Sequence, residues 1–307
     1  MNTIISSKQN PRIKQLLLLQ QKSSERRRTG LFVVEGQREL SHCLEAGYEV
    51  EELYLCPDLC DPSTLRSTPC EFLEVSSDEV ERTLEELSTA KYPPPNRREL
   101  ERGFSTFNVT PAVYEHIAYR GSTEGIMAVV RARHLTLASL DTLFSSPNAL
   151  QIPRHHGALI IVLESVEKPG NLGAILRSAD AAGADAVIVC DPLTDLYNPN
   201  LIRASIGAIF TVPTVACTSA ECITFLRERG IQILTAQLQD SHPYYDIDMR
   251  RPTAIVMGTE ATGLTEQWRQ AATAHIRIPM LGRLDSLNVS VSSAILLYEA
   301  VRQRMSN

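Results

Sequence analysis

A polar pair in an otherwise apolar segment is the first feature of this sequence that could do chemistry. In the run NLGAILRSADAAG, Asn171 and Arg177 are separated by six positions. Taken alone, Asn171 could cap a helix and Arg177 could form a surface ion pair. However, Arg177 is flanked by Ile175 and Leu176, and a cation on a packed helix needs a partner. A phosphate or a carboxylate would bind it with bidentate geometry, so Arg177 is a candidate anion ligand.

A glycine-rich turn, GTEATGL, follows an apolar run further along the chain. Gly258 and Gly263 allow the backbone to turn tightly and to approach a ligand. Glu260 lies between them. It could orient Arg177, or it could simply be an acid that the dipole of the following helix favours.

A third segment, IRIPMLGRLDSLNVS, combines apolar residues with a polar loop. Ile278, Met280 and Leu287 could line an apolar slot for a cofactor, or they could be ordinary core residues. Ser286 and Asn288 precede a long apolar helix. They could cap this helix or form hydrogen bonds with a substrate. The usual signatures of dinucleotide-binding and P-loop proteins, GxGxxG and GxxxxGK[ST], are absent from the sequence.

After residue 157, short apolar runs typical of strands alternate with helical patterns. The elements that they predict must position these residues. The alternation predicts a parallel sheet with helices on both faces, and ligands of such sheets bind beyond the carboxyl ends of the strands. The loops after Leu163, Ala236, Met257 and Ile278 are therefore where chemistry is expected. The predicted strands are 159–163, 186–190, 212–215, 231–236, 253–257 and 276–278, and the predicted helices are 172–182, 198–206, 220–229, 264–272 and 289–304.

The first part of the chain predicts a smaller α/β domain. Asn10 and Pro11 are typical of a helix start, and a second helix is expected from Gly36 to Leu44. We expect a loop at residues 23–30 and an exposed insertion at residues 91–111, where three consecutive prolines interrupt the pattern. The expected domains are residues 1–134 and 157–307, joined by a linker at 135–156. Strands are predicted at 31–34, 50–55, 72–75 and 126–130, and a further helix at 78–87.

The composition is that of a soluble two-domain protein, with 307 residues, 43% apolar and 21% charged. No segment has the length of a membrane span or the pattern of a signal peptide, so we expect a cytoplasmic protein without a membrane partner. The formal net charge of −6 argues against a surface coated with positive charge.

Positive charge is nevertheless concentrated at the N-terminus. Residues 1–28 hold seven Lys and Arg residues against Glu25. They form either a solvated helix face or an RNA-binding surface, for which the candidates are Arg12, Lys14, Arg26, Arg27 and Arg28.

The seven cysteines show no metal-binding pattern. Cys56, Cys60 and Cys70 are close in sequence, but no CxxC pair or histidine accompanies them at ligand spacing. We therefore expect buried or free thiols and no metal site.

The three polar segments together resemble the signature motifs of the SpoU-type RNA ribose 2′-O-methyltransferases, the TrmH-like branch of the SPOUT superfamily. The N-terminal run NPRIKQLLLLQQKSSERRRTGLFVVEGQREL and the run GSTEGIMAVVR are similar to the ribosomal-protein-like substrate-binding domain of rRNA-directed members. The matching positions of the motifs are Asn171, Arg177, Gly258, Glu260, Gly263, Ile278, Pro279, Leu287, Asn288 and Ser290.

This resemblance implies a fold, a cofactor and a partner. The fold would be an α/β structure whose C-terminal parallel-sheet SPOUT domain contains a deep trefoil knot, preceded by a small α/β ribosomal-protein-like domain. The knotted region would bind S-adenosylmethionine, and the protein would be a homodimer through its C-terminal domain. The implied cofactor contacts are Thr235, Ala236, Gly258, Ile278 and Leu287.

The implied reaction is methyl transfer to a ribose 2′-hydroxyl of RNA, most simply 23S-type rRNA. Arg177 would act as the base or, more conservatively, would bind the adjacent phosphate, because a guanidinium stays charged unless strongly perturbed. Glu260 would hold Arg177 in position. Ser286 and Asn288 would orient the ribose, and Asn171 would share their pocket. The alternatives are a tRNA 2′-O-methyltransferase and a non-catalytic RNA- or ribosome-binding protein of the same fold.

Overall fold

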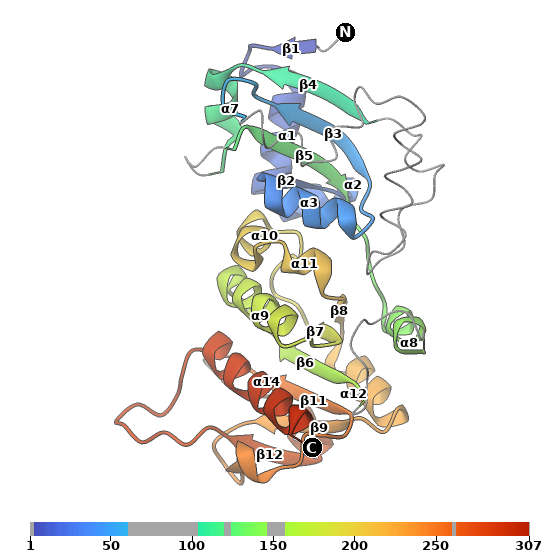
Figure 1. Cartoon of the computed structure of the whole chain (residues 1–307), viewed down its shortest axis with the longest axis vertical. Coiled ribbons are helices and arrows are strands. Elements are labelled where there is room, and N and C mark those ends of the chain that lie inside the picture. The colour runs from blue at the N-terminus through green and yellow to red at the C-terminus, as the bar shows by residue number, and fades with distance from the viewer. Residues whose placement is uncertain (1–2, 61–103, 120–123, 146–156, 260–261, 307) are drawn as a thin grey trace. The chain divides into compact units, whose positions relative to one another are not determined.

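The computed structural model describes residues 3–60, 104–119, 124–145, 157–259 and 262–306. The chain forms two compact units (Figure 1). Unit 1 comprises Met1–Arg133 and Leu196–Phe210, and unit 2 comprises His134–Asp195 and Thr211–Asn307. Among the described residues, none of the helices has the length and apolarity that crossing a membrane would require.

Unit 1 is built on a mixed sheet of five strands in the order β1-β4-β3-β5-β2. β4 is parallel to both of its neighbours, whereas β5 is antiparallel to β2 and β3. The strands are β1 (Thr3–Ile5), β2 (Leu31–Glu35), β3 (Val50–Leu55), β4 (Ser105–Val109) and β5 (Ile126–Arg131).

Helices cover this sheet and bury its apolar residues. The Asn10 side chain accepts a hydrogen bond from the amide of Arg12 at 2.9 Å, so the predicted start of the first helix is confirmed. The side chains of Ile13, Leu16 and Leu19 are buried in the core. The helices of unit 1 are α1 (Pro11–Gln21), α2 (Ser23–Thr29), α3 (Gln37–Glu45), α7 (Pro111–Ile117), α10 (Pro199–Ser205) and α11 (Ala208–Thr211), the last of which ends one residue beyond the unit.

A segment from the second half of the sequence belongs to unit 1. The ring of Tyr197 stacks on that of Phe32, with 4.3 Å between their centroids. The ring of Phe210 lies 6.0 Å from Phe32 on the same aromatic cluster. The helix predicted at residues 198–206 is confirmed as α10, but the sequence carried no sign that this helix would pack in the first unit.

Two predictions for unit 1 are wrong. The expected loop at residues 23–30 is helix α2, which ends at Gly30 in the left-handed conformation (φ +67°) and is supported by an ion pair between Arg28 and Glu25. The expected insertion ends earlier than predicted, because Ser105–Val109 is a strand between β1 and β3 with Phe107 and Val109 buried. The other elements predicted between residues 61 and 103 lie outside the described residues.

Unit 2 contains a sheet of seven strands in the order β10-β12-β9-β11-β6-β7-β8, and every pairing in it is parallel. The predicted parallel α/β architecture is therefore confirmed. The strands are β6 (Leu159–Glu164), β7 (Ala186–Cys190), β8 (Thr214–Cys217), β9 (Gln232–Ala236), β10 (His242–Pro243), β11 (Thr253–Met257) and β12 (Ala274–Arg277), with a 3₁₀ turn, η2 (Tyr244–Asp246), after β10.

Helices lie on both faces of this sheet. Ile160 and Val162 of β6 belong to a buried cluster with residues of α8, α12 and α13. Because side chains alternate along a strand, Leu159 and Ile161 face the opposite side, where α9 and α14 pack on each other and on the sheet (Figure 1). The helices are α8 (Leu137–Ser145), α9 (Pro169–Ala181), α12 (Ser219–Glu228), α13 (Glu266–Ala271) and α14 (Val289–Met305).

The helix α8 lies within the residues expected to be a linker. The side chain of Leu140 in this helix is fully buried in the core of unit 2. Just before the helix, Leu135 forms an isolated parallel β-bridge with Val215 of β8. The predicted linker therefore contains a packed helix, and residues 146–156 of it lie outside the described residues.

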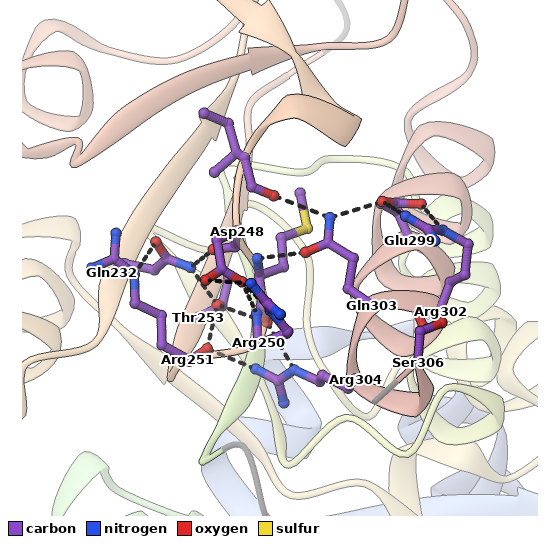
Figure 2. Close-up of polar contacts among 12 residues, drawn as sticks. Gln232, Asp248, Arg250, Arg251, Thr253, Glu299, Arg302, Gln303, Arg304 and Ser306 are labelled. Carbon is purple, nitrogen blue, oxygen red and sulfur yellow. Dashed lines mark hydrogen bonds and ion pairs between the residues drawn. The ribbon is translucent and has the colours of Figure 1, made fainter.

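Polar contacts fix the last helix to the sheet (Figure 2). The guanidinium of Arg304 donates hydrogen bonds to the main-chain oxygens of Met249, Gly157, Ala158 and Arg251 at 2.9–3.1 Å. The side chain of Gln303 accepts from the Met249 amide at 2.8 Å. The C-terminal end of α14 is thereby held beside the amino ends of β6 and β11, which leaves its N-terminal end at the opposite edge of the sheet.

Candidate active site

The carboxyl ends of three neighbouring strands bring together most of the predicted cofactor residues. Parallel strands β12, β9 and β11 are adjacent, so their carboxyl ends lie at one edge of the sheet. Thr235 and Ala236 end β9, Gly258 follows β11, and Ile278 follows β12. Thr235 is fully buried, and its hydroxyl lies 2.6 Å from Nδ1 of His275. Its side chain is therefore engaged, while Ile278 is half-buried at the end of its strand.

The turn after β11 requires glycine at position 258. A β-carbon there would lie 2.3 Å from the carbonyl carbon of Gly263, a distance that no packed side chain tolerates. Gly263 itself is in the left-handed region, with φ +67°, and its amide donates to the oxygen of Thr259 at 3.1 Å. The two glycines thus fold the turn back on itself. Glu260, which the sequence placed between them, lies outside the described residues.

A buried carboxylate anchors this turn, and the sequence analysis missed it. Glu164, at the end of β6, is 2% exposed. It accepts hydrogen bonds from the amide of Thr265 at 2.9 Å and from its hydroxyl at 2.6 Å. Ser219 donates to the same carboxylate at 3.4 Å and accepts from the indole of Trp268 at 3.0 Å. An acidic residue ending a strand that is otherwise wholly apolar was the available signal.

Two asparagines link the first and third predicted motifs. The Asn288 side chain donates from Nδ2 to Oδ1 of Asn171 at 3.2 Å, across 117 positions of sequence. Asn288 also caps α14, because its Oδ1 accepts from the Ser290 amide at 3.0 Å. Asn171, by contrast, is not a cap: α9 begins at Pro169, so Asn171 lies inside the first turn and its side chain is used for the contact with Asn288.

Arg177 lies on the same helix and is exposed. Among the described residues, no hydrogen bond or ion pair of its guanidinium is found. Its predicted partner, Glu260, lies outside the described residues. An exposed guanidinium on a helix whose neighbouring residues Ile175 and Leu176 are buried is well placed to bind an external anion.

The segment before α14 is exposed over its whole length. Leu281, Leu284 and Leu287 are exposed to 98%, 75% and 39%, and the segment extends away from the rest of unit 2 in Figure 1. The hydroxyl of Ser286 contacts only the carboxylate of its neighbour Asp285, at 3.4 Å, among the described residues. Ser286 and Leu287 are therefore not brought to the strand ends by a described contact, and their roles stay predictions.

The basic residues predicted to bind RNA lie on α1 and α2 of unit 1 and differ in what they contact. Lys14 and Arg27 are exposed. Arg28 pairs with Glu25 at 2.6 Å, and Arg12 pairs with Glu52 while lying over the ring of Phe107. Arg26 is 5% exposed and donates to the main-chain oxygens of Leu19 and Gln20. The contacts of Arg26 hold α1 to α2, so we assign it a structural role.

Unit 1 also contains a cavity of about 250 Å³. The carboxylates of Glu35, Glu39 and Glu124 line it together with Arg38 and Arg203. Burial raises the pKa of Glu35 above its ordinary value. Because acidic groups outnumber basic ones in this lining, the cavity is poorly suited to an RNA phosphate.

The cysteines, predicted to be free or buried thiols, differ in their surroundings between the two units. In unit 1, Cys56 and Cys60 are buried, and the Cys60 thiol donates to the oxygen of Gly125 at 3.1 Å. Cys70 lies outside the described residues. In unit 2, three cysteines that are far apart in sequence meet, which the sequence analysis did not anticipate.

Comparison with family models gives two matches. The model of the SpoU rRNA Methylase family matches residues 158–298, and that of the MRM3-like substrate binding domain matches residues 10–94. The first match begins with β6 and ends within α14, so it contains every strand end described above.

Curated relatives match both halves of the chain. The 23S rRNA (guanosine-2′-O-)-methyltransferase RlmB of Vibrio vulnificus is 36% identical over 207 residues, which cover 67% of this chain and 81% of that protein. RlmB of Bordetella pertussis is 38% identical over 182 residues, covering 59% and 71% respectively.

Solved structures match over nearly the whole chain. A crystal structure of an RNA 2′-O ribose methyltransferase has a TM-score of 0.72 and 33% identity and covers 99% of this chain and 100% of its own. The AdoMet-bound rRNA methyltransferase from Sinorhizobium meliloti has a TM-score of 0.76 at 26% identity, with 99% of each chain covered.

Proposed function

Because this chain belongs to the SpoU rRNA methylase family, we propose that it transfers a methyl group from S-adenosylmethionine to a ribose 2′-hydroxyl of ribosomal RNA. One observation supports this most directly. The hydrogen bond between Asn171 and Asn288 joins two of the family motifs on the face of the sheet that carries Arg177. The relatives named RlmB act on guanosine of 23S rRNA, and we propose the same substrate class for this chain.

The strand ends fit the proposed cofactor. Adenine is bound in proteins by apolar walls and a few main-chain polar groups. The edge formed by Ala236, Gly258 and Ile278 offers main-chain groups at the ends of three parallel strands, and the turn at Gly258 has no side chain that could obstruct them. Leu287 would complete the apolar wall. When bound, S-adenosylmethionine supplies the electrophilic methyl group.

Residues of α9 and the N-terminus of α14 would handle the ribose. The 2′-hydroxyl is a poor nucleophile that must lose its proton during attack. We assign Arg177 to the phosphate next to the target ribose, where its fixed positive charge also stabilises the developing alkoxide. Asn171, Ser286 and Asn288 would orient the sugar, and Glu260 would hold Arg177.

Unit 1 would supply affinity for RNA. Its match to a substrate binding domain and the exposed side chains of Lys14, Arg27 and Arg28 support this role. Phosphate contacts of this kind fix the orientation of the RNA and weaken as salt concentration rises. We propose that the enzyme acts in the cytoplasm, where ribosomal RNA would be available to it.

A homodimer through unit 2 would cover an apolar surface on α14. Val291 and Tyr298 are seven positions apart on this helix and are 47% and 50% exposed. Leu281 and Leu284, in the segment just before it, are exposed still further. Apolar residues spaced by two helical turns lie on one face, and such a face is typical of an oligomer interface.

The trefoil knot is also part of the proposal. β12 lies beyond β9 at one side of the sheet, and the chain then returns to pack α14 on α9, β6 and β11. A return of this kind across the sheet is what threading of the C-terminus through a loop would require. An experimental density map that traces residues 258–289 would test it.

The proposed activity can be tested with purified protein, tritiated S-adenosylmethionine and RNA. We expect label to be incorporated into deproteinised 23S rRNA and to be recovered as 2′-O-methylguanosine after digestion, with no incorporation into tRNA. Label in a methylated base, or in tRNA alone, would contradict the proposal. A failure to bind S-adenosylmethionine in calorimetry would favour the non-catalytic alternative.

A further inference from the structure

Three cysteine thiols converge between the sheet and α12 in unit 2. Cys190 ends β7 and Cys217 ends β8, and these two residues are direct partners in the parallel register. Cys222 lies in the first turn of α12 after Ser219. The sulfur atoms of all three lie within 4.8 Å of one another.

The spacing of the sulfurs matches what a metal ion needs. With metal–sulfur bonds of about 2.3 Å, two sulfurs on one ion lie roughly 3.8–4.0 Å apart in tetrahedral or trigonal geometry. The triangle therefore needs shifts of about 1 Å or less per sulfur to close on a central ion. A disulfide, by contrast, requires about 2.05 Å between two sulfurs and would leave the third cysteine unpaired.

The burial of the three cysteines also suits a metal–thiolate site. Cys190 and Cys222 are fully buried, whereas Cys217 is partly exposed and gives an ion access from solvent.

The nearest carboxylates in sequence are already engaged. Asp191 accepts from the hydroxyl of Ser219 at 2.6 Å, and Glu221 accepts from the amide and hydroxyl of Thr218 at 2.8 and 2.7 Å. The donor set among the described residues is therefore sulfur alone. Such a set selects soft ions, whereas magnesium and calcium require oxygen ligands.

We propose that Cys190, Cys217 and Cys222 bind one thiophilic metal ion with a filled d shell, Zn(II) or Cu(I). Cu(I) is satisfied by three sulfurs, whereas Zn(II) would add a water at the partly exposed side. The bound ion would tie the ends of β7 and β8 to the start of α12. Ser219 at that start also contacts Glu164, the carboxylate that anchors the turn after β11. The site is independent of methyl transfer and needs no RNA.

The test uses the full chain, purified under reducing conditions and stripped of metal. Zn(II) and Cu(I) are each titrated in competition with a chromophoric chelator, and Co(II) serves as a spectroscopic probe of sulfur ligation. The wild type should bind one equivalent of Zn(II) or of Cu(I) at this site. If both ions bind, the one with the higher affinity is identified as the preferred ion. Cys217→Ser, a substitution at the partly exposed position, should remove that equivalent or weaken its binding at least about tenfold.

Matched variants and a labelling experiment complete the design. Cys43→Ala and Cys60→Ala each remove a buried thiol of unit 1, outside the proposed site. Both variants should therefore bind the metal ion as the wild type does. In wild-type protein, the metal should slow alkylation of Cys217, and Mg²⁺ should not. Equal stoichiometry and affinity in wild type and Cys217→Ser would overturn the proposal. The proposal would also be overturned if neither ion bound with micromolar affinity, or if a disulfide between two of the three cysteines survived treatment with a reducing agent.

Discussion

At the scale of single residues, the amide of Asn288 has two separate tasks. Its oxygen accepts from the Ser290 amide at 3.0 Å and caps α14, and its nitrogen donates to Asn171 at 3.2 Å. The first task is structural. The second joins two helices at the edge of the sheet where the strand ends lie. Because the two tasks use different atoms, substitution can separate them.

Asn288→Asp keeps an oxygen for the cap but loses the donor to Asn171. We expect its free energy of unfolding to stay within about 0.5 kcal/mol of wild type, while methyl transfer falls by at least about tenfold. Asn288→Ala should lose activity and, in addition, about 1 kcal/mol of stability, because the cap is also removed. Urea unfolding and initial rates measure both. Wild-type turnover in the Asp variant would show that the contact with Asn171 has no part in the reaction.

Gly258 offers a second prediction at this scale. In Gly258→Ala the new methyl group would lie 2.3 Å from the carbonyl carbon of Gly263, so the turn must move. We expect affinity for S-adenosylmethionine to fall by about tenfold or more in calorimetry. Gly282→Ala is the matched control, because a β-carbon there meets nothing within 4 Å. Equal affinities in the two variants would remove the turn from the cofactor site.

At the scale of elements, α14 is held at its C-terminal end by main-chain contacts. Arg304 donates to four carbonyl oxygens. The nearby Arg302 is an exposed residue paired with Glu299 (Figure 2). We expect Arg304→Gln to lower the free energy of unfolding by about 1–3 kcal/mol and Arg302→Gln by less than about 1 kcal/mol. Chemical unfolding compares them, and a larger effect of Arg302 would contradict the assignment of Arg304 as the anchor.

Glu299 makes part of this anchoring depend on pH. Hydrogen bonds from Arg302 hold the pKa of Glu299 below its ordinary value of 4.5. Since the folded state lowers this pKa, the associated stability is complete above about pH 4.5 and is lost as the pH falls below it. The difference in unfolding free energy between wild type and Glu299→Gln should therefore shrink between pH 7 and roughly pH 3.5. A constant difference across that range would contradict the shift.

At the scale of the whole molecule, we propose that unit 1 supplies RNA affinity and unit 2 the chemistry. Replacing both Lys14 and Arg27 by Gln should weaken RNA binding and flatten the plot of log affinity against log salt, by about one in slope for each phosphate that is no longer neutralised. The rate of methyl transfer at saturating RNA should not change. Arg250→Gln, which removes a charge paired with Asp248 in unit 2, is the control and should leave the slope unaltered.

Most of the architecture of unit 2 was predictable, because most of its strands are apolar runs bounded by helix starts and glycines. The two-residue strand β10 and the helix α8 were not predicted. β11, for example, spans the residues predicted for it, and the resemblance to the SpoU family is confirmed by the family match and the relatives. Periodicity was insufficient where a short element depends on its neighbours. Strand β4 follows a charged, proline-containing stretch and has only two apolar residues, Phe107 and Val109, and α2 consists mostly of polar residues.

The candidate site was predictable by residue type but not by contact. The sequence singled out Asn171 and Asn288, yet only the packing of α9 on α14 reveals that they meet. Glu164 and the three clustered cysteines escaped notice because their partners are more than twenty positions away or on another element. Contacts of this kind arise from strand order, which no local pattern encodes.

The central claim is that this chain methylates a ribose 2′-hydroxyl of ribosomal RNA with Arg177 at the site of reaction. Its most direct test is a map of 2′-O-methyl groups on rRNA from cells that have or lack the gene, complemented with wild type or Arg177→Ala. We predict that one 2′-O-methylguanosine of 23S rRNA disappears without the gene and returns with the wild type but not with the variant. Identical methylation maps in all four strains would contradict the account.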